Sequence, residues 1–304
     1  MTALGAAPFR HDRLDATAAS VLLLCCALWG FQSVAIKLAT PGIPPFLQAG
    51  IRSVIALAFL WAWSAWRGVR LVERDGTLAA GLLVGALFAL EFAFLYMALN
   101  FTTASRAVVF LYTAPFFTAL GLHLFVPGER FRRHQVVGLV CAFVGVLAVF
   151  ADALAFPDAT MLLGDALALV AAAGWAATTV VVKGSRLIAI SPNRTLAYQL
   201  AVSAAVLPLL SLATGEPGIV RLDAVVVGSV LYQAVVVAFA SYLAWFWLMR
   251  HYPAPQLSAF TFFAPLFGVA GGALVLGETV GIGLVVGAVF VGTGIWLVNR
   301  PVRR

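Results

Sequence analysis

The chain has 304 residues, of which 63% are hydrophobic and only 10% are charged. Soluble domains carry about 25% charged residues, so this composition excludes an ordinary water-soluble fold and predicts the lipid bilayer as the main partner. The formal net charge is +7. The basic residues are spread over the breaks between apolar runs and form no single patch, which argues against nucleic-acid binding.

Apolar runs and short polar breaks alternate along the chain. Runs of about 18 or more apolar residues predict transmembrane helices, and a backbone in lipid must satisfy its own hydrogen bonds, which favours helices over open strands. The first run is too long for a signal-peptide core, so we predict an uncleaved first span. The predicted spans are 17–38, 46–66, 77–99, 103–125, 134–151, 162–183, 193–213, 223–248, 254–276 and 280–298. The sequence therefore predicts an all-α integral membrane protein with ten transmembrane helices.

Basic residues are divided unevenly between the two sets of breaks. One set, together with both ends of the chain, holds most of the arginines, whereas the other set holds only Lys37, Arg106 and Arg221. Cytoplasmic loops carry an excess of Lys and Arg. We therefore expect the N-terminal segment 1–16 and the tail 299–304 to lie in the cytoplasm.

The two halves of the sequence resemble each other. "ALWGFQSVAIK" (27–37) matches "AGWAATTVVVK" (173–183), and "FLYTAPFFTAL" (110–120) matches "FTFFAPLFGVA" (260–270). Each half has an odd number of predicted spans, so the second half would cross the membrane in the opposite sense. Inverted repeats of this kind are typical of secondary transporters.

The chain resembles the EamA-type branch of the drug/metabolite transporter superfamily. The resemblance rests on "LWGFQSVAIK", the paired "TAPFF" and "FAPLF" segments, the "GE" after spans four and nine, and the glycine-spaced spans five and ten. It implies two inverted five-helix repeats, 17–151 and 162–298, with a central cavity formed largely by the first, third and fourth spans of each half. We also expect a multi-pass protein of the cell inner membrane, because the sequence shows no targeting segment; a eukaryotic membrane is the alternative.

The resemblance also bears on the substrate, because members of this superfamily move amino acids, metabolites, nucleotide sugars or drugs. Bacterial members of this size are most often similar to exporters of amino acids. We therefore expect a secondary transporter that exports small metabolites, including neutral or aromatic amino acids, by alternating access. A drug or nucleotide-sugar transporter is the alternative, and both a monomer and a dimer are compatible with the sequence.

Arg52 in the second span and Glu91 in the third are the charged residues that fall well inside predicted spans, whereas Asp165 lies near the end of one. Ionisable residues inside a membrane are costly and mark functional sites. We predict that both face the interior of the bundle, where they form a pair or are bridged by substrate or water. Their counterparts in the second half, Gln199 and Ser241, are uncharged, so the feature concerns substrate or coupling more than fold. A purely structural ion pair is the alternative.

Aromatic residues with polar neighbours form a second group of candidates. Trp29 and Trp175 correspond across the repeat, and each is followed three residues later by a polar residue, Gln32 or Thr178. Residues three or four apart share a helix face, so these pairs are predicted to line a substrate cavity, with helix packing as the alternative. An aromatic wall suits a small zwitterion, because cation–π contact attracts an ammonium group. The further predicted substrate contacts are Glu91, Tyr96, Tyr112 and Tyr242.

Prolines recur at matching positions in the fourth and ninth spans. Pro115 and Pro265 would each remove a backbone hydrogen bond and bend a helix, leaving carbonyl groups available to water or substrate. We predict a hinge at each proline, with a static kink as the alternative. Small residues allow close helix approach, so the glycines of spans five and ten are expected to serve the scaffold or a dimer contact: Gly138, Gly145, Gly287 and Gly294.

An intramembrane enzyme is the competing class. It would need a catalytic constellation such as an "HExxH" helix, and a nucleotide hydrolase would need a "GxxxxGK" loop; the sequence contains neither. We therefore predict no enzymatic activity, no catalytic residues, no cofactor and no metal. Proton coupling through Glu91 and facilitated diffusion are both compatible with the sequence.

Overall fold

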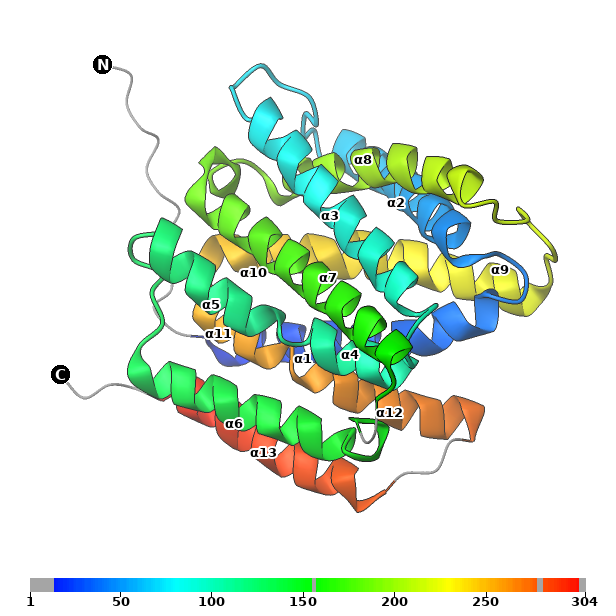
Figure 1. Cartoon of the computed structure of the whole chain (residues 1–304). Coiled ribbons are helices and arrows are strands. Elements are labelled where there is room, and N and C mark those ends of the chain that lie inside the picture. Colours follow the sequence, from blue (N-terminus) through cyan, green and yellow to red (C-terminus); the bar gives the residue numbers. More distant parts are fainter. Residues whose placement is uncertain (1–13, 155–156, 278–280, 301–304) are drawn as a thin grey trace, which may run out of the picture.

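The structure is a computed structural model that describes residues 14–154, 157–277 and 281–300. Its described residues form helices and connecting turns, with no strand among them (Figure 1). The helical elements are α1 (Ala16–Ala39), α2 (Pro45–Trp66), α3 (Leu78–Ala98), α4 (Ala104–Leu111), α5 (Ala114–Phe125), α6 (Arg133–Val149), α7 (Ala159–Gly184), α8 (Pro192–Ala213), α9 (Ala224–Leu231), the π-helix η3 (Tyr232–Ser241), α10 (Tyr242–His251), α11 (Ala254–Phe260), α12 (Phe263–Leu276) and α13 (Ile282–Asn299).

The predicted spans are confirmed as apolar helical segments. In the described part of the chain, nine segments are long and apolar enough to cross a membrane. The remaining predicted span is α6, an apolar helix of 17 residues. At a rise of about 1.5 Å per residue its length is about 25 Å, slightly less than the roughly 30 Å of a bilayer core. The chain is thus an all-α protein whose ten spans match the sequence prediction.

Local sequence explains where the two repeats begin. The first helix of each repeat starts after an aspartate: Asp15 accepts a hydrogen bond from the Ala18 amide at 2.8 Å, and Asp158 accepts one from the Met161 amide at 2.7 Å. An N-cap carboxylate satisfies an amide that has no intrahelical partner. The same cap at matching places is consistent with two copies of one structural unit.

The fourth and ninth spans are not single bent helices, as the proline prediction assumed. Each consists of two helices: α4 ends at Leu111 and α5 begins at Ala114, while α11 ends at Phe260 and α12 begins at Phe263. Both prolines lie in the first turn of the second helix, where the missing amide costs nothing because it would have no intrahelical acceptor.

Threonine side chains close both of these breaks. The hydroxyl of Thr113 donates to the carbonyl of Phe110 at 2.6 Å, and that of Thr261 donates to the carbonyl of Ser258 at 2.7 Å. These two carbonyl groups are therefore bonded by the chain itself. This finding limits the prediction that the prolines leave carbonyls for water or substrate.

The eighth span contains a feature that the sequence did not predict. Between α9 and α10 the backbone follows a π-helix of 10 residues, Tyr232–Ser241. π-Helical turns are rare and occur often at functional sites. Its last residue, Ser241, anchors a cavity tryptophan, as described below.

The two halves pack as reciprocal partners. α1 of the first half lies against η3, α10 and α12 of the second, and α7 of the second half lies against α3, α4 and α5 of the first. α2 pairs with α8, and α6 pairs with α13 along the lower edge of Figure 1. This exchange of roles is what a pseudo-two-fold axis between inverted repeats produces.

Glycines bring α6 and α13 into close contact. A Cβ atom added at Gly138 would lie 2.5 Å from the carbonyl oxygen of Gly294, and one added at Gly145 would lie 2.7 Å from that of Gly287. Both pairs are contacts within one chain, so these glycines serve the scaffold and are not available for the alternative dimer contact.

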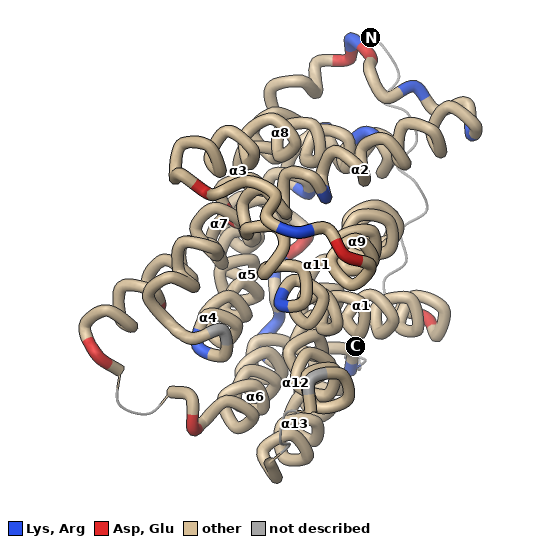
Figure 2. The backbone as a smooth tube through the Cα atoms, turned by 90° about the vertical axis from the view of Figure 1, so that its right-hand side faces the viewer, with Lys and Arg blue, Asp and Glu red and all other residues tan. Residues whose placement is uncertain are grey.

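The bundle has two ends, which we name by the chain termini. The terminal end holds Ala16, the start of α1, and Asn299, the end of α13; the distal end holds Ala39, the end of α1 (Figure 1). Figure 2 views the molecule from the distal end and shows how sparsely charged residues are distributed along the helices.

Candidate functional site

A central cavity of about 330 Å³ lies between the two halves. Its wall comes mainly from α1, α3 and α4 of the first half and α7, α10 and α12 of the second. These are the first, third and fourth spans of each repeat, as the family resemblance implied. All residues predicted to contact substrate lie in this wall: Trp29, Gln32, Glu91, Tyr96, Tyr112, Trp175, Thr178 and Tyr242.

The first cavity tryptophan is held in place by the second half. The indole nitrogen of Trp29 donates to the hydroxyl of Ser241 at 2.9 Å. Its ring makes edge contacts with Tyr242 and Trp245, with centroid distances of 6.2 and 5.4 Å. Edge-to-face contacts of this kind are favourable, so the Trp29 ring has a fixed orientation in the wall.

The second cavity tryptophan has a similar aromatic neighbour. Trp175 makes an edge contact with Tyr112 at a centroid distance of 5.7 Å. On the same helix, the hydroxyl of Thr178 donates to the carbonyl of Gly174 at 3.1 Å. Trp175 and Thr178 thus share a helix face toward the cavity, as their spacing predicted.

Arg52 and Glu91 both lie in the interior, but they do not form a direct pair in this structure. Glu91 is buried and lines the cavity. The Arg52 side chain is fully buried and lies over the ring of Phe92, with its guanidinium carbon 4.3 Å from the ring centroid. All three guanidinium nitrogens lack a hydrogen-bond partner among the described residues. An arrangement in which substrate or water bridges Arg52 and Glu91 stays a prediction.

The two prolines occupy different places relative to the cavity. Pro265 is part of the cavity wall. Pro115 borders a small void of about 10 Å³, which Trp175 and Thr261 also line. Both prolines therefore lie next to the candidate site, at the breaks between paired helices, and their hinge role stays a prediction.

A polar cluster that we call the terminal clasp joins the halves at the terminal end. It consists of Lys183, Glu129, Tyr252 and Ala254. The Lys183 ammonium lies 3.0 Å from a carboxylate oxygen of Glu129 and donates to the carbonyl of Tyr252 at 2.8 Å. The other oxygen of Glu129 accepts from the Ala254 amide at 3.0 Å. This clasp ties the end of α7 to the segments that follow α5 and α10.

This role of Lys183 was not predicted from the sequence. A charged residue at the end of an apolar run looks the same in sequence whether it faces water or a buried partner. The repeat gave one indication that this position matters, because the matching residue Lys37 also lies at the end of its span. Lys183 is 8% exposed and outside the cavity wall, whereas Lys37 is exposed and lines the cavity.

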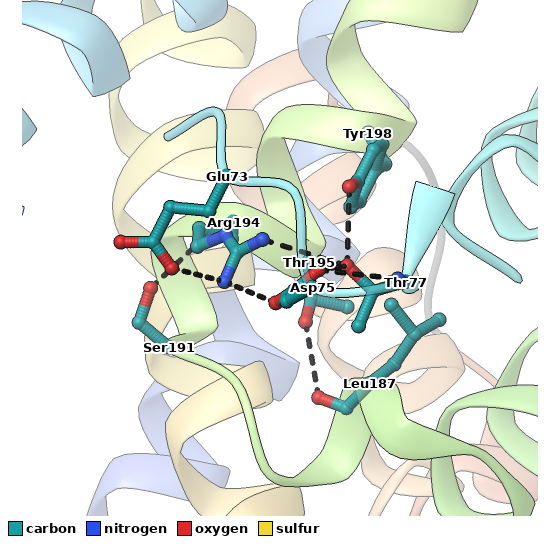
Figure 3. Close-up of polar contacts among 8 residues, drawn as sticks. All are labelled: Glu73, Asp75, Thr77, Leu187, Ser191, Arg194, Thr195 and Tyr198. Carbon is teal, nitrogen blue, oxygen red and sulfur yellow. Dashed lines mark hydrogen bonds and ion pairs between the residues drawn. The ribbon is translucent and has the colours of Figure 1, made fainter. Parts of the chain in front are cut away.

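A second cluster crosses the halves at the terminal end (Figure 3). Arg194, at the start of α8, reaches the loop between α2 and α3, where its guanidinium lies 3.0 Å from Glu73 and 2.7 Å from Asp75. Thr77 donates to Asp75 at 2.6 Å and lies 3.2 Å from the Tyr198 hydroxyl. Hydrogen bonds from Arg194 and Thr77 hold the pKa of Asp75 well below its ordinary range.

A buried ion pair joins the halves at the distal end. The guanidinium of Arg106 pairs with Asp165, and its Nε atom donates to the carboxylate at 3.2 Å. Thr102 donates to the same carboxylate at 3.0 Å. Neither charged residue lines the cavity, so this pair fixes α4 against α7 without facing the candidate site.

The described residues contain no group of three or more His, Cys, Asp or Glu side chains that could hold a metal ion. The chemistry that the cavity offers is therefore aromatic contact, the carboxylate of Glu91, the ammonium group of Lys37 and a few neutral hydrogen-bonding groups. Such a wall can bind and release a small molecule.

Comparison with known proteins places this architecture in a family. The EamA-like transporter family matches residues 16–151 and 162–300. A protein of Escherichia coli (strain K12) named "Probable amino-acid metabolite efflux pump" is 30% identical over 286 residues, covering 90% of this chain and 92% of that protein. A protein of Bacillus subtilis (strain 168), "Uncharacterized transporter YoaV", is 26% identical over 273 residues, covering 89% and 92%.

A solved crystal structure shares the fold. It superposes with a TM-score of 0.81 at 19% sequence identity and covers 93% of this chain and 96% of its own. The family and these named relatives are transporters, not enzymes. This chain, a multi-pass membrane protein that transports small metabolites, belongs to the EamA-like transporter family.

Proposed function

We propose that this protein exports amino acids or closely related metabolites by alternating access through the central cavity. One observation carries the proposal: the aromatic and polar residues singled out by the repeat converge on one cavity between the halves. The printed name of the Escherichia coli relative, an amino-acid metabolite efflux pump, supports the substrate class. The aromatic wall suits amino acids, because ring faces attract an ammonium group and pack against apolar side chains.

The cavity and the terminal clasp together suggest which end is accessible. The wall reaches the distal ends of α1, α3 and α4, at Lys37, Leu99 and Ser105. At the terminal end, Lys183 and Glu129 close the space between α7 and the segments after α5 and α10. We infer a state that is open at the distal end and closed at the terminal end.

Charge distribution supports an orientation for this state. Most basic residues flank the helices at the terminal end, and the cytoplasmic side of a membrane protein is the more basic one. The terminal end is then cytoplasmic, and the cavity faces the outside of a bacterial inner membrane. Release of the clasp would open the cavity to the cytoplasm, while the inverted repeat supplies the matching closure at the distal end.

Uptake into liposomes by the purified protein tests the proposal. The panel contains radiolabelled neutral and aromatic amino acids, with a nucleotide sugar and a cationic dye as controls. Saturable uptake of an amino acid that is stimulated by the same amino acid on the opposite side supports an amino-acid carrier. Movement of a control compound alone would replace the proposed substrate with a drug or a sugar nucleotide.

A further inference from the structure

Arg52 has an environment that the proposed function does not yet explain. Its side chain is 0% exposed, and its three nitrogens make no hydrogen bond of good geometry among the described residues, although the hydroxyl of Tyr242 in the cavity wall lies near the guanidinium. The contact with the Phe92 ring supplies a favourable face for the charge, but a ring face does not replace an oxygen acceptor for the N–H groups. A buried guanidinium in this state is suited to accept an anionic group in bidentate geometry.

Phe92 contacts both the Arg52 guanidinium and the cavity. Its ring lines the cavity and also touches Arg52, which is outside the wall. One turn further along α3, Tyr96 lines the cavity with a buried hydroxyl that has no partner among the described residues. The α3 face therefore presents an unpaired hydroxyl group beside the Phe92 ring.

Glu91, the residue before Phe92, provides the opposite charge. It lines the cavity and packs beside α7, because a Cβ atom added at Gly174 would lie 3.6 Å from the Glu91 Cβ. Gly174 directly precedes the cavity tryptophan Trp175. A carboxylate next to an aromatic ring is suited to a primary ammonium group.

We propose that Arg52 and Glu91 are the two poles of a zwitterion site. Glu91 takes the α-ammonium group of the substrate, and Arg52 takes the α-carboxylate once the Phe92 ring turns aside. The substrate side chain then lies against the aromatic wall. The repeat counterparts Gln199 and Ser241 are uncharged, so the site is single and gives the substrate one orientation. This inference rests on the proposed function and names the substrate class as free α-amino acids.

Binding of three probes to the full-length protein in nanodiscs tests the site. The probes are phenylalanine, phenylalaninamide, which lacks the carboxylate, and N-acetylphenylalanine, which lacks the ammonium group. We expect each analogue to bind about 10- to 100-fold more weakly than phenylalanine, because each loses a charge-assisted hydrogen bond. An amide that binds as tightly as phenylalanine overturns the role of Arg52, and an equally tight N-acetyl compound overturns that of Glu91.

Variants assign the two poles. Arg52→Gln should abolish the preference over the amide and keep the preference over the N-acetyl compound, whereas Glu91→Gln should do the reverse. Arg52→Lys should retain discrimination against the amide. The control Arg106→Gln/Asp165→Asn removes a buried charge pair outside the cavity and should leave both preferences unchanged. If it abolishes them too, the assignment is wrong.

Counterflow with the same protein separates this inference from the proposed function. Selective binding without phenylalanine transport would contradict the proposed carrier function but would support the zwitterion site. Transport of phenylalanine with equal affinity for all three probes would support the proposed carrier function and overturn the zwitterion site. Absence of binding by all three probes also overturns the site.

Discussion

Replacement of Lys183 by methionine is expected to open the terminal end of the bundle. The ammonium group lies 3.0 Å from Glu129, and the two side chains are only 3% and 2% exposed. Removing one partner of a buried ion pair costs about 3–5 kcal/mol, because the other charge is stranded. If the clasp exists only in the terminal-closed state, this cost falls on that state alone. It would shift the conformational equilibrium about a hundredfold to several thousandfold.

Electron-spin distance measurements in nanodiscs report this shift. Spin labels are placed at Arg130, which directly follows Glu129 in the chain, and at Ala189, which follows Lys183 by six residues; both positions are exposed. The Lys183→Met protein should gain a population with a longer separation. The double variant Lys183→Met/Glu129→Leu strands no charge and should lose less stability than the two single changes added together. A lower melting temperature with an unchanged distance distribution would refute the gating role and leave an ordinary structural ion pair.

Three further predictions follow from the described contacts. Gly138→Ala should lower the thermal stability because its Cβ atom would meet the backbone of α13, whereas Gly292→Ala, with no atom within 4 Å of the added Cβ, should be neutral or stabilising by up to about 1 kcal/mol. The double variant Trp29→Ala/Trp175→Ala should fold and lose at least about 10-fold of its affinity for aromatic amino acids; unaltered binding would remove the tryptophans from the site. The folded-state pKa of Asp75 is lowered, so the carboxylate stabilises the fold above its unfolded pKa of about 3.9, and this stabilisation is lost as the pH falls below that value. Melting curves measured across this pH range should therefore show a smaller acid-induced loss of stability for Asp75→Asn than for the parent protein.

The spans and the repeat were predictable because the bilayer imposes a length and a composition on each helix. The repeat then pointed to Trp29 and Trp175, since two matching mid-span tryptophans in an inverted pair must face a common axis or the lipid. Their polar neighbours Gln32 and Thr178 favoured the axis. The cavity wall contains all four residues.

Local changes in the backbone hydrogen-bonding pattern of the helices were not predictable from the apolar pattern of the sequence. The break between α4 and α5 and the π-helix at Tyr232–Ser241 leave the average hydropathy of their spans unchanged. A proline indicates that a helix is interrupted near that point, but it does not distinguish a bend from the start of a new helix. The structure places Pro115 and Pro265 at the start of a new helix.

The direction of individual side chains was the second feature that could not be predicted from the sequence. The sequence predicted that Arg52 and Glu91 form a pair or are bridged by substrate or water. A long arginine side chain can reach several neighbours, and here it lies over Phe92. The role of Lys183 was hidden for the same reason, since its partners Glu129 and Tyr252 come from distant segments.

Blocking the cavity is the most direct test of whether it is the transport path. Ser33 lines the cavity and is exposed, while Thr40 is exposed near the same end of α1 and outside the wall. Each is replaced by cysteine in a protein without Cys25, Cys26 and Cys141, labelled with a bulky thiol reagent, and measured by phenylalanine counterflow in liposomes. The account predicts that labelling abolishes transport by Ser33→Cys, that phenylalanine slows this labelling, and that labelled Thr40→Cys remains active. Full transport by labelled Ser33→Cys would contradict it.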